Sequence, residues 1–172
     1  MEKPKGIDYL NYLEKTGRYV FHGSPDGNID VLVPKQAHHI PDLSKLTEMI
    51  EDGKPAVSAT PYADFAVFRA IINRKNAPSI KHSGFGFNQN KQKEFRLSTR
   101  AVLEEIKNKK GYVYVFYKKD FEPYSRSGQA HEGDMEWRSY TEVSPVEIVE
   151  VQYEDLKHIE PIVQFTDSKH MV

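Results

Sequence analysis

The sequence Tyr-Val-Tyr-Val-Phe-Tyr, residues 112–117, contains only β-branched and aromatic residues and predicts the clearest strand of the chain. A long loop rich in Ser, Gly, Asp and His follows it. Residues 136–143 and 146–153 then predict two further strands, which Ser-Pro at 144–145 separates, and residues 159–165 predict a last strand. The second half of the chain is therefore expected to consist mainly of strands.

Helices are expected mostly in the N-terminal half. Residues 7–15 and 42–50 carry apolar residues at helical spacing. Residues 61–73 predict a well-buried helix, with Thr60 as its N-cap and a proline at its first position. Residues 103–110 predict a charged helical turn that ends at the following glycine.

Short strands are expected between these helices, at residues 19–21 and 56–59. A further apolar piece covers residues 29–33, and residues 83–87 suggest a flexible loop or a ragged hairpin. Because helices and strands are segregated rather than alternating, the sequence predicts an α+β fold. The length of 172 residues fits one domain spanning residues 1–172.

The composition excludes several classes of function. The chain has 24 Lys and Arg against 25 Asp and Glu, so no global basic field exists to hold a polyanion. The absence of cysteine excludes disulfides, Cys-ligated zinc, iron–sulfur clusters and a thiol nucleophile. Apolar runs are too short for a membrane span, and residues 1–5 lack the apolar core of a signal peptide. We therefore expect a soluble cytoplasmic protein without a membrane partner.

Three short motifs stand out. His22-Gly23-Ser24 follows a short strand, residues 56–62 form a strand-to-helix junction, and Glu136 opens a strand after the long loop. In this order the motifs resemble those of the diphtheria-toxin-like and poly(ADP-ribose) polymerase-like ADP-ribosyltransferases. The resemblance extends from about Tyr19 to Tyr153 and rests on few specific residues.

The resemblance implies an architecture and an activity. The family fold has two small antiparallel sheets that frame an NAD cleft, with His22 expected on one and Glu136 on the other. The implied activity is NAD-dependent mono-ADP-ribosyl transfer, or NAD hydrolysis, with an unidentified protein or nucleic acid as acceptor. NAD is then a substrate, and no metal is required.

The resemblance also implies roles for individual residues. The Gly23 backbone would bind the nicotinamide carboxamide through a paired N–H and C=O, and Ser24 would contact the same group. His22 would hydrogen-bond the adenosine-side ribose. Glu136 would bind the 2′-hydroxyl of the nicotinamide ribose and stabilise the cation that forms as the bond breaks.

The middle motif departs from the family pattern. Val57 or Ser58 occupies the position where the family has an aromatic residue in the second strand. Tyr62, or Phe65 from the same helix, would then supply the ring that stacks on nicotinamide, beside Ser58 as a cofactor-binding residue. Strand alternation from Glu136 onward is expected to place residues 136, 138 and 140 on one face and Trp137 on the other.

Two other functions remain open. The first is a catalytically weak module that binds a nucleotide or a protein in the same cleft, which the missing strand aromatic favours. The second is an RNA-directed 2′-phosphotransferase-like enzyme, which would need basic residues around His22. Glu132, Glu142 and Glu147 compete with Glu136 for the role of catalytic carboxylate.

Two further patterns resemble binding sites. The basic stretches 91–96 and 107–110, with Phe85 nearby, could form a local nucleic-acid surface, although most such runs are solvated faces. The adjacent His38 and His39 suggest a metal pair, but neighbouring side chains point apart on a strand or helix. We therefore expect no metal site.

Overall fold

The protein folds into three helices and eleven strands within the part of the chain that the computed structural model describes, residues 5–39 and 49–166. The elements in chain order are α1 (Ile7–Lys15), β1 (Tyr19–Ser24), β2 (His38–His39), β3 (Ile50–Glu51), β4 (Val57–Ala59), α2 (Ala63–Ile71), β5 (Ser83–Phe87), β6 (Lys93–Leu97), α3 (Ala101–Glu105), β7 (Lys110–Tyr117), β8 (Glu122–Pro123), β9 (Trp137–Ser139), β10 (Glu147–Gln152) and β11 (Val163–Phe165). Three 3-10 helices lie at Lys118–Asp120, Tyr153–Leu156 and Glu160–Ile162.

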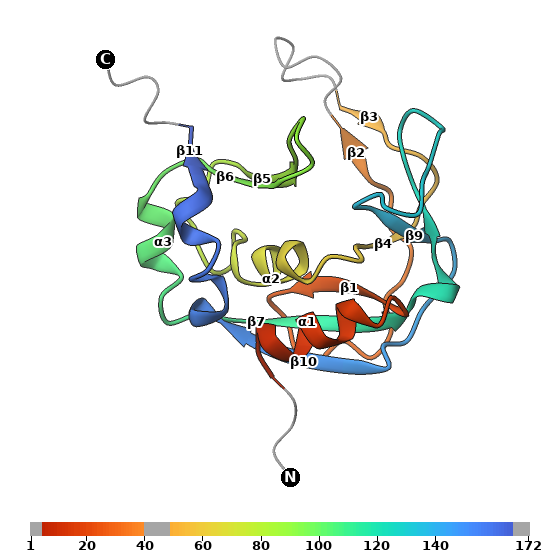
Figure 1. The fold of residues 1–172 in the computed structure, drawn as a ribbon, viewed down its shortest axis with the longest axis horizontal. Coiled ribbons are helices and arrows are strands. Elements are labelled where there is room, and N and C mark those ends of the chain that lie inside the picture. The colour runs from red at the N-terminus through yellow and green to blue at the C-terminus, as the bar shows by residue number, and fades with distance from the viewer. Residues whose placement is uncertain (1–4, 40–48, 167–172) are drawn as a thin grey trace.

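The strands form four small sheets (Figure 1). In the largest, β7 lies between β1 and β10 and pairs antiparallel with both, so that His22 lies opposite Tyr114. A second sheet has the order β11-β6-β5, with β6 and β11 parallel, and a third has the order β4-β9-β8. Strands β2 and β3 form a two-stranded ribbon.

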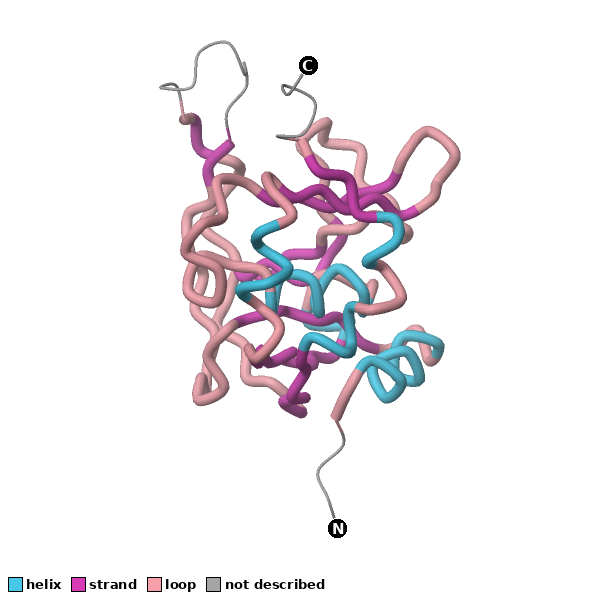
Figure 2. The backbone as a smooth tube through the Cα atoms, turned by 90° about the vertical axis from the view of Figure 1, so that its left-hand side faces the viewer, coloured by secondary structure: helices cyan, strands magenta, loops and turns pink. Residues whose placement is uncertain are grey.

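Helix α2 lies between two of these sheets (Figures 1 and 2). Toward β5 and β6, the rings of Phe65 and Phe68 pack against Phe85 and Phe95, with ring centroids 4.6 Å apart for Phe65 and Phe85 and 5.2 Å apart for Phe68 and Phe95. Phe65, Phe68 and Phe95 belong to the main hydrophobic core, and the partly buried Phe85 packs against it. The helix has apolar residues on two sides, because it is covered by a sheet on each of them.

Toward the β1-β7-β10 sheet, α2 contacts the strands through its backbone. A Cβ atom added to Gly23 would lie 2.7 Å from the Ala70 nitrogen and closer still to the Ala66 carbonyl oxygen. One added to Gly111 would lie 2.8 Å from the Ala70 Cβ and closer still to the Ala70 carbonyl oxygen. No side chain fits in either place, so the two glycines allow the helix to rest directly on the sheet.

Several sequence predictions are confirmed. The fold is α+β, the first helix spans the predicted residues 7–15, and residues 112–117 form a strand that begins two residues earlier. Residues 83–87 form one arm of a regular hairpin with β6. Two of the three helices lie in the N-terminal half of the chain.

Other predictions of helix ends are wrong. Thr60 is not the N-cap of α2, because its backbone exchanges two hydrogen bonds with Phe21, at 2.7 and 2.9 Å, and is held extended. The helix therefore begins at Ala63 and ends at Ile71. Gly111 does not end a helical turn over residues 103–110. The helical segment lies earlier, at Ala101–Glu105. Gly111 belongs to β7 and lies opposite Val151 of β10.

The predicted strands also differ in extent. Residues 136–143 shorten to the three-residue β9, and residues 29–33 contribute only an isolated bridge from Leu32 to Val143. Four sheets with one parallel pair replace the two antiparallel sheets that the resemblance implies. Most of the helix predicted at residues 42–50 lies outside the described residues, and Ile50 at its end belongs to β3.

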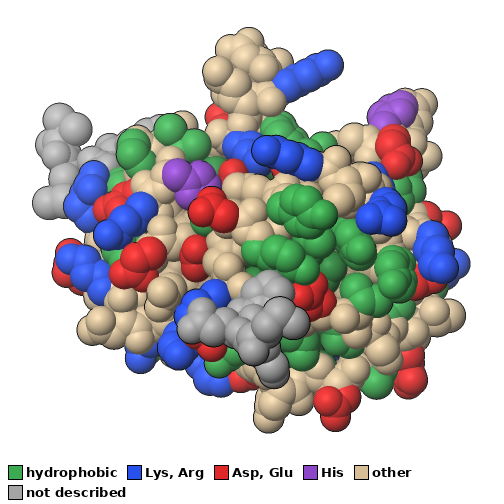
Figure 3. All heavy atoms as spheres, turned by 60° about the horizontal axis from the view of Figure 1, so that its bottom comes forward, with side chains coloured by type: hydrophobic (Ala, Val, Ile, Leu, Met, Phe, Trp, Pro, Cys, Tyr) green, Lys and Arg blue, Asp and Glu red, His purple; other side chains and the backbone are tan. Residues whose placement is uncertain are grey.

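Acidic and basic side chains are mixed on the surface of the described residues. Figure 3 shows acidic and basic side chains interspersed on the face that it presents. In the described ranges, no helix combines the length and the hydrophobicity that crossing a bilayer requires. The protein therefore presents no wide surface of one sign on that face, in agreement with its net charge of −1.

The contact between α2 and the sheet predicts a stability effect. Gly111→Ala should lower the free energy of unfolding by about 3 kcal/mol, because the new methyl group would overlap backbone atoms of α2. Urea unfolding followed by circular dichroism measures this. Gly86→Ala is the matched control, since its Cβ would have its nearest neighbour at 3.9 Å. Equal effects of the two substitutions would contradict the close packing described for Gly111.

Candidate functional site

A pocket of about 390 Å³ opens where β1, β4, α2, β5 and the segment before β9 meet. This volume lies within the range of about 300–1,000 Å³ typical of small-molecule sites. Its walls are mostly apolar, with a few polar groups between them. The lining residues are Phe21, His22, Gly23, Ser58, Ala59, Thr60, Phe65, Ala66, Arg69, Gly84, Phe85, Met135 and Glu136.

The pocket holds a histidine in a defined tautomer. Nδ1 of His22 lies 2.7 Å from the carbonyl oxygen of Ser58, and because a carbonyl only accepts, Nδ1 must carry the proton. Burial has the largest effect and lowers the pKa of His22. The hydrogen bond to the Ser58 carbonyl opposes it less strongly, and the positive charge of Lys35 adds a smaller lowering. The imidazole is therefore neutral at pH 7, and its Nε2 is a hydrogen-bond acceptor.

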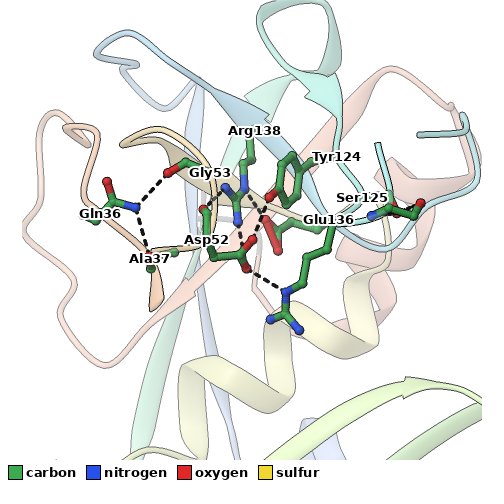
Figure 4. A network of polar contacts seen from close by, with 10 residues as sticks. Gln36, Ala37, Asp52, Gly53, Tyr124, Ser125, Glu136 and Arg138 are labelled. Carbon is green, nitrogen blue, oxygen red and sulfur yellow. Dashed lines mark hydrogen bonds and ion pairs between the residues drawn. The ribbon is translucent and has the colours of Figure 1, made fainter. Parts of the chain in front are cut away.

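Glu136 enters the pocket beside a buried arginine (Figure 4). The Nε of Arg138 donates to the Glu136 carboxylate, and the side chain of Arg138 is only 1% exposed. The Arg138 guanidinium also donates to the Asp52 carbonyl oxygen at 2.6 Å and stacks 3.5 Å from the centre of the Tyr124 ring. Arg138 thus fixes where the Glu136 carboxylate lies.

Asp52 supports this arginine from the other side. Its carboxylate accepts hydrogen bonds from the Tyr124 hydroxyl at 2.6 Å and from Arg126 Nε at 2.9 Å, and it lies 3.4 Å from Arg138. Burial opposes ionisation of Asp52, but these hydrogen bonds and the two arginine charges outweigh it and hold the pKa below its usual value. The network therefore keeps the Asp52 carboxylate ionised next to a buried cation, an arrangement that is costly to break.

Only some of the predicted site residues meet in the pocket. His22, Gly23, Ser58 and Glu136 line it together, and so does Phe65, one of the two rings considered for nicotinamide. The Phe65 ring stacks on Phe85 with planes 17° apart, so one of its two faces is already covered.

Ser24 and Tyr62 lie outside the lining. The Ser24 hydroxyl accepts a hydrogen bond from the Asp26 N–H at 3.1 Å, within the turn after β1. The Tyr62 hydroxyl donates to the Gly133 carbonyl at 2.6 Å, and its ring packs edge-on against Phe87. Both side chains therefore have structural partners, and their contacts with a ligand stay predictions.

The competing carboxylates lie elsewhere. Glu132 forms an ion pair with Lys118 at 3.0 Å, Glu147 accepts a hydrogen bond from the Tyr9 hydroxyl at 2.7 Å, and Glu142 is exposed. Of the four glutamates considered, Glu136 alone lines the pocket.

The two basic stretches are partly neutralised. Their ion pairs are Lys93–Asp64, Arg96–Glu94, Lys107–Glu104 and Lys110–Glu150. Within the described ranges, no group of three or more His, Asp or Glu side chains is arranged to hold a metal ion. A nucleic-acid surface on these stretches stays a prediction that no contact here supports.

The sequence indicates one of the residues that complete the site but not the others. The spacing Glu136-x-Arg138 on a predicted strand indicated a shared face, and the contact between the two side chains confirms it. Nothing in the sequence pointed to Asp52, which comes from a distant loop, or to Arg69, which α2 carries into the pocket.

Comparison with known proteins adds no relative. No protein-family model matches the chain, and no curated protein or solved structure matches it either.

The electrostatics of His22 predict a response to one substitution. Lys35→Gln should raise the pKa of His22, because a positive charge that disfavours the imidazolium is removed. NMR titration of the ring measures this, with Lys157→Gln as an exposed lysine control. Because folding lowers this pKa, the associated stability is present above about pH 6.5 and is lost as the pH falls. An unchanged His22 pKa in Lys35→Gln would contradict this assignment.

The buried network predicts a pH-dependent stability effect. Asp52→Asn should lower the free energy of unfolding by about 3 kcal/mol at pH 7, because Arg138 loses a charged partner. Asp120→Asn, at an exposed aspartate, should change it by less than about 0.5 kcal/mol. Since the pKa of Asp52 is lowered, its contribution exists above about pH 4 and is lost below. The difference in the free energy of unfolding between wild type and Asp52→Asn should therefore become smaller as the pH falls from 7 to 3, and urea unfolding at several pH values measures it.

Proposed function

We propose that the protein transfers a single ADP-ribosyl group from NAD to an acceptor, or hydrolyses NAD at the same bond. The observation that carries the proposal is that His22 and Glu136, far apart in the sequence, line one pocket with the backbone of Gly23. These are the residues to which the resemblance assigns cofactor binding and catalysis.

The chemistry requires a carboxylate where positive charge develops. When the bond between nicotinamide and C1′ of the ribose breaks, the electron pair leaves with nicotinamide and C1′ becomes cationic; the acceptor or water then attacks C1′ and loses a proton. Glu136 would hydrogen-bond the 2′-hydroxyl and stabilise this cation, an effect that is largest in a water-poor site. The apolar walls formed by Phe65 and Phe85 supply such surroundings, and Arg138 holds the carboxylate in place.

The backbone of Gly23 offers a fitting site for the nicotinamide amide. β1 is an edge strand of its sheet, and Phe21 directs both its N–H and its C=O outward to Thr60. Because these directions repeat every second residue, Gly23 directs its own N–H and C=O to the same side. A carboxamide carries one acceptor and two donors and can bond to both groups.

His22 would orient the second ribose. Its neutral imidazole accepts at Nε2, and a ribose hydroxyl can donate to it. Since the Ser58 carbonyl holds Nδ1, the ring keeps this orientation before the ligand arrives. Preorganised polar groups of this kind reduce the cost of binding and of reaching the transition state.

A binding module without turnover is the second candidate. Tyr62 lies outside the pocket lining, and one face of the Phe65 ring is covered by Phe85, so fewer aromatic surfaces are available for nicotinamide than the family pattern implies. An RNA-directed 2′-phosphotransferase would need several basic residues around His22, and among the described residues that line this pocket Arg69 alone is an arginine or lysine.

Glu136→Gln tests the proposal. Nicotinamide release from NAD, measured by chromatography, should fall at least about 100-fold, because an interaction made mainly in the transition state is lost. The affinity for NAD should stay within about tenfold. Glu142→Gln, at an exposed glutamate after β9, should leave release unchanged.

The outcomes separate the candidates. Normal release by Glu136→Gln would remove this carboxylate from catalysis. NAD binding without any release by the parent protein would favour the binding module. Circular dichroism of each variant shows whether the fold persists after the contact with Arg138 changes.

A further inference from the structure

A second hollow adjoins the proposed NAD pocket. It measures about 260 Å³ and shares Arg69 with the first pocket; its other lining residues run from the end of α2 to β5: Asn73, Arg74, Ile80, Lys81, His82 and Ser83. We propose that this hollow, here called the basic hollow, binds a phosphate group of the ligand whose nicotinamide riboside occupies the first pocket. The inference rests on the proposed function and extends it to the phosphate-bearing part of the substrate.

The charge of the basic hollow suits an anion. Arg69 and Arg74 line it together with Lys81 and His82, and the described residues of its lining include no carboxylate. In the described part of the chain, neither Arg69 nor Arg74 forms an ion pair, whereas Lys93 and Lys110 do. Uncompensated arginines in a concave site bind phosphate well, because the guanidinium fork matches two phosphate oxygens.

Arg69 is held at the boundary between the two cavities. Its guanidinium carbon lies 5.2 Å from the centre of the Phe85 ring, and Nη1 reaches the Ser83 hydroxyl at 3.4 Å. A guanidinium has five N–H donors, so most remain for a ligand. The cation is thus positioned by an aromatic face and a hydroxyl without being neutralised.

The order of groups along a dinucleotide matches this arrangement. The phosphates follow the nicotinamide ribose on the side away from nicotinamide. With that ribose near Glu136 and the amide at Gly23, a bent dinucleotide would place its phosphates past Arg69 in the basic hollow and return its second ribose to His22. Two sources supply the same chemistry, the diphosphate of NAD and the additional monophosphate of NADP.

Inorganic pyrophosphate tests the hollow directly. Calorimetry on the full chain should detect binding, and Arg69→Gln and Arg74→Gln should each weaken it about tenfold or more, as expected for a charge-assisted hydrogen bond. Lys157→Gln removes the same charge at an exposed position outside both cavities and should leave binding unchanged. No pyrophosphate binding, or equal losses in all three variants, would overturn the proposal.

A ligand series identifies the source of the phosphate. Nicotinamide riboside, nicotinamide mononucleotide, NAD and NADP carry none, one, two and three phosphates. Arg74→Gln changes a residue that lines the basic hollow and is not part of the first pocket's lining, so it should leave the riboside affinity unchanged and weaken the phosphate-bearing members. Weakening that begins with the mononucleotide or NAD assigns the diphosphate, and weakening of NADP alone assigns the additional phosphate. An equal loss for the riboside would overturn the proposal.

The two proposals fail separately. Absence of nicotinamide release with intact, Arg69-dependent pyrophosphate binding would reject the transferase and keep the basic hollow. Release from NAD by Arg69→Gln and Arg74→Gln at wild-type affinity would reject the hollow and keep the transferase. Melting temperatures of the variants confirm that each is folded.

Discussion

The rest of the structure depends on the direct contact between the backbone of α2 and the β1-β7-β10 sheet. Gly23 and Gly111, on neighbouring strands, leave room for the carbonyl groups of Ala66 and Ala70. This contact determines how closely α2 approaches the β1-β7-β10 sheet. The opposite face of the helix then contacts the aromatic rings of β5 and β6. Two sheets that share no strand are thereby joined through one helix of nine residues.

The same contact shapes the pocket. Because α2 lies against β1, its residues Phe65, Ala66 and Arg69 form a wall next to His22. Gly23 therefore has a structural reason to be glycine that is independent of any ligand: the space where its side chain would lie is filled by α2. Its backbone can still serve a ligand, since that edge of β1 is directed toward the pocket.

The sequence predicts what local rules control. The strand at residues 112–117 and the helix at residues 7–15 follow from residue type and spacing, and the Glu136–Arg138 contact follows from strand alternation. Thr60 has the chemistry of an N-cap, but its bridge to Phe21 is a tertiary contact that overrides local preference. Asp52 and Arg69 enter the site through packing between distant segments, which one sequence does not encode in any local pattern.

The hydrogen bond from His22 to the Ser58 carbonyl has a chemical consequence. Because Nδ1 donates to the Ser58 carbonyl and Nε2 carries only a lone pair, Nε2 can bond only to a hydrogen-bond donor. A sugar hydroxyl satisfies it, whereas an ether, a ketone or an ester oxygen at the same place would face lone pair against lone pair. A main-chain oxygen from β4 thus determines which chemical groups can bond to the other ring nitrogen, without contacting those groups itself.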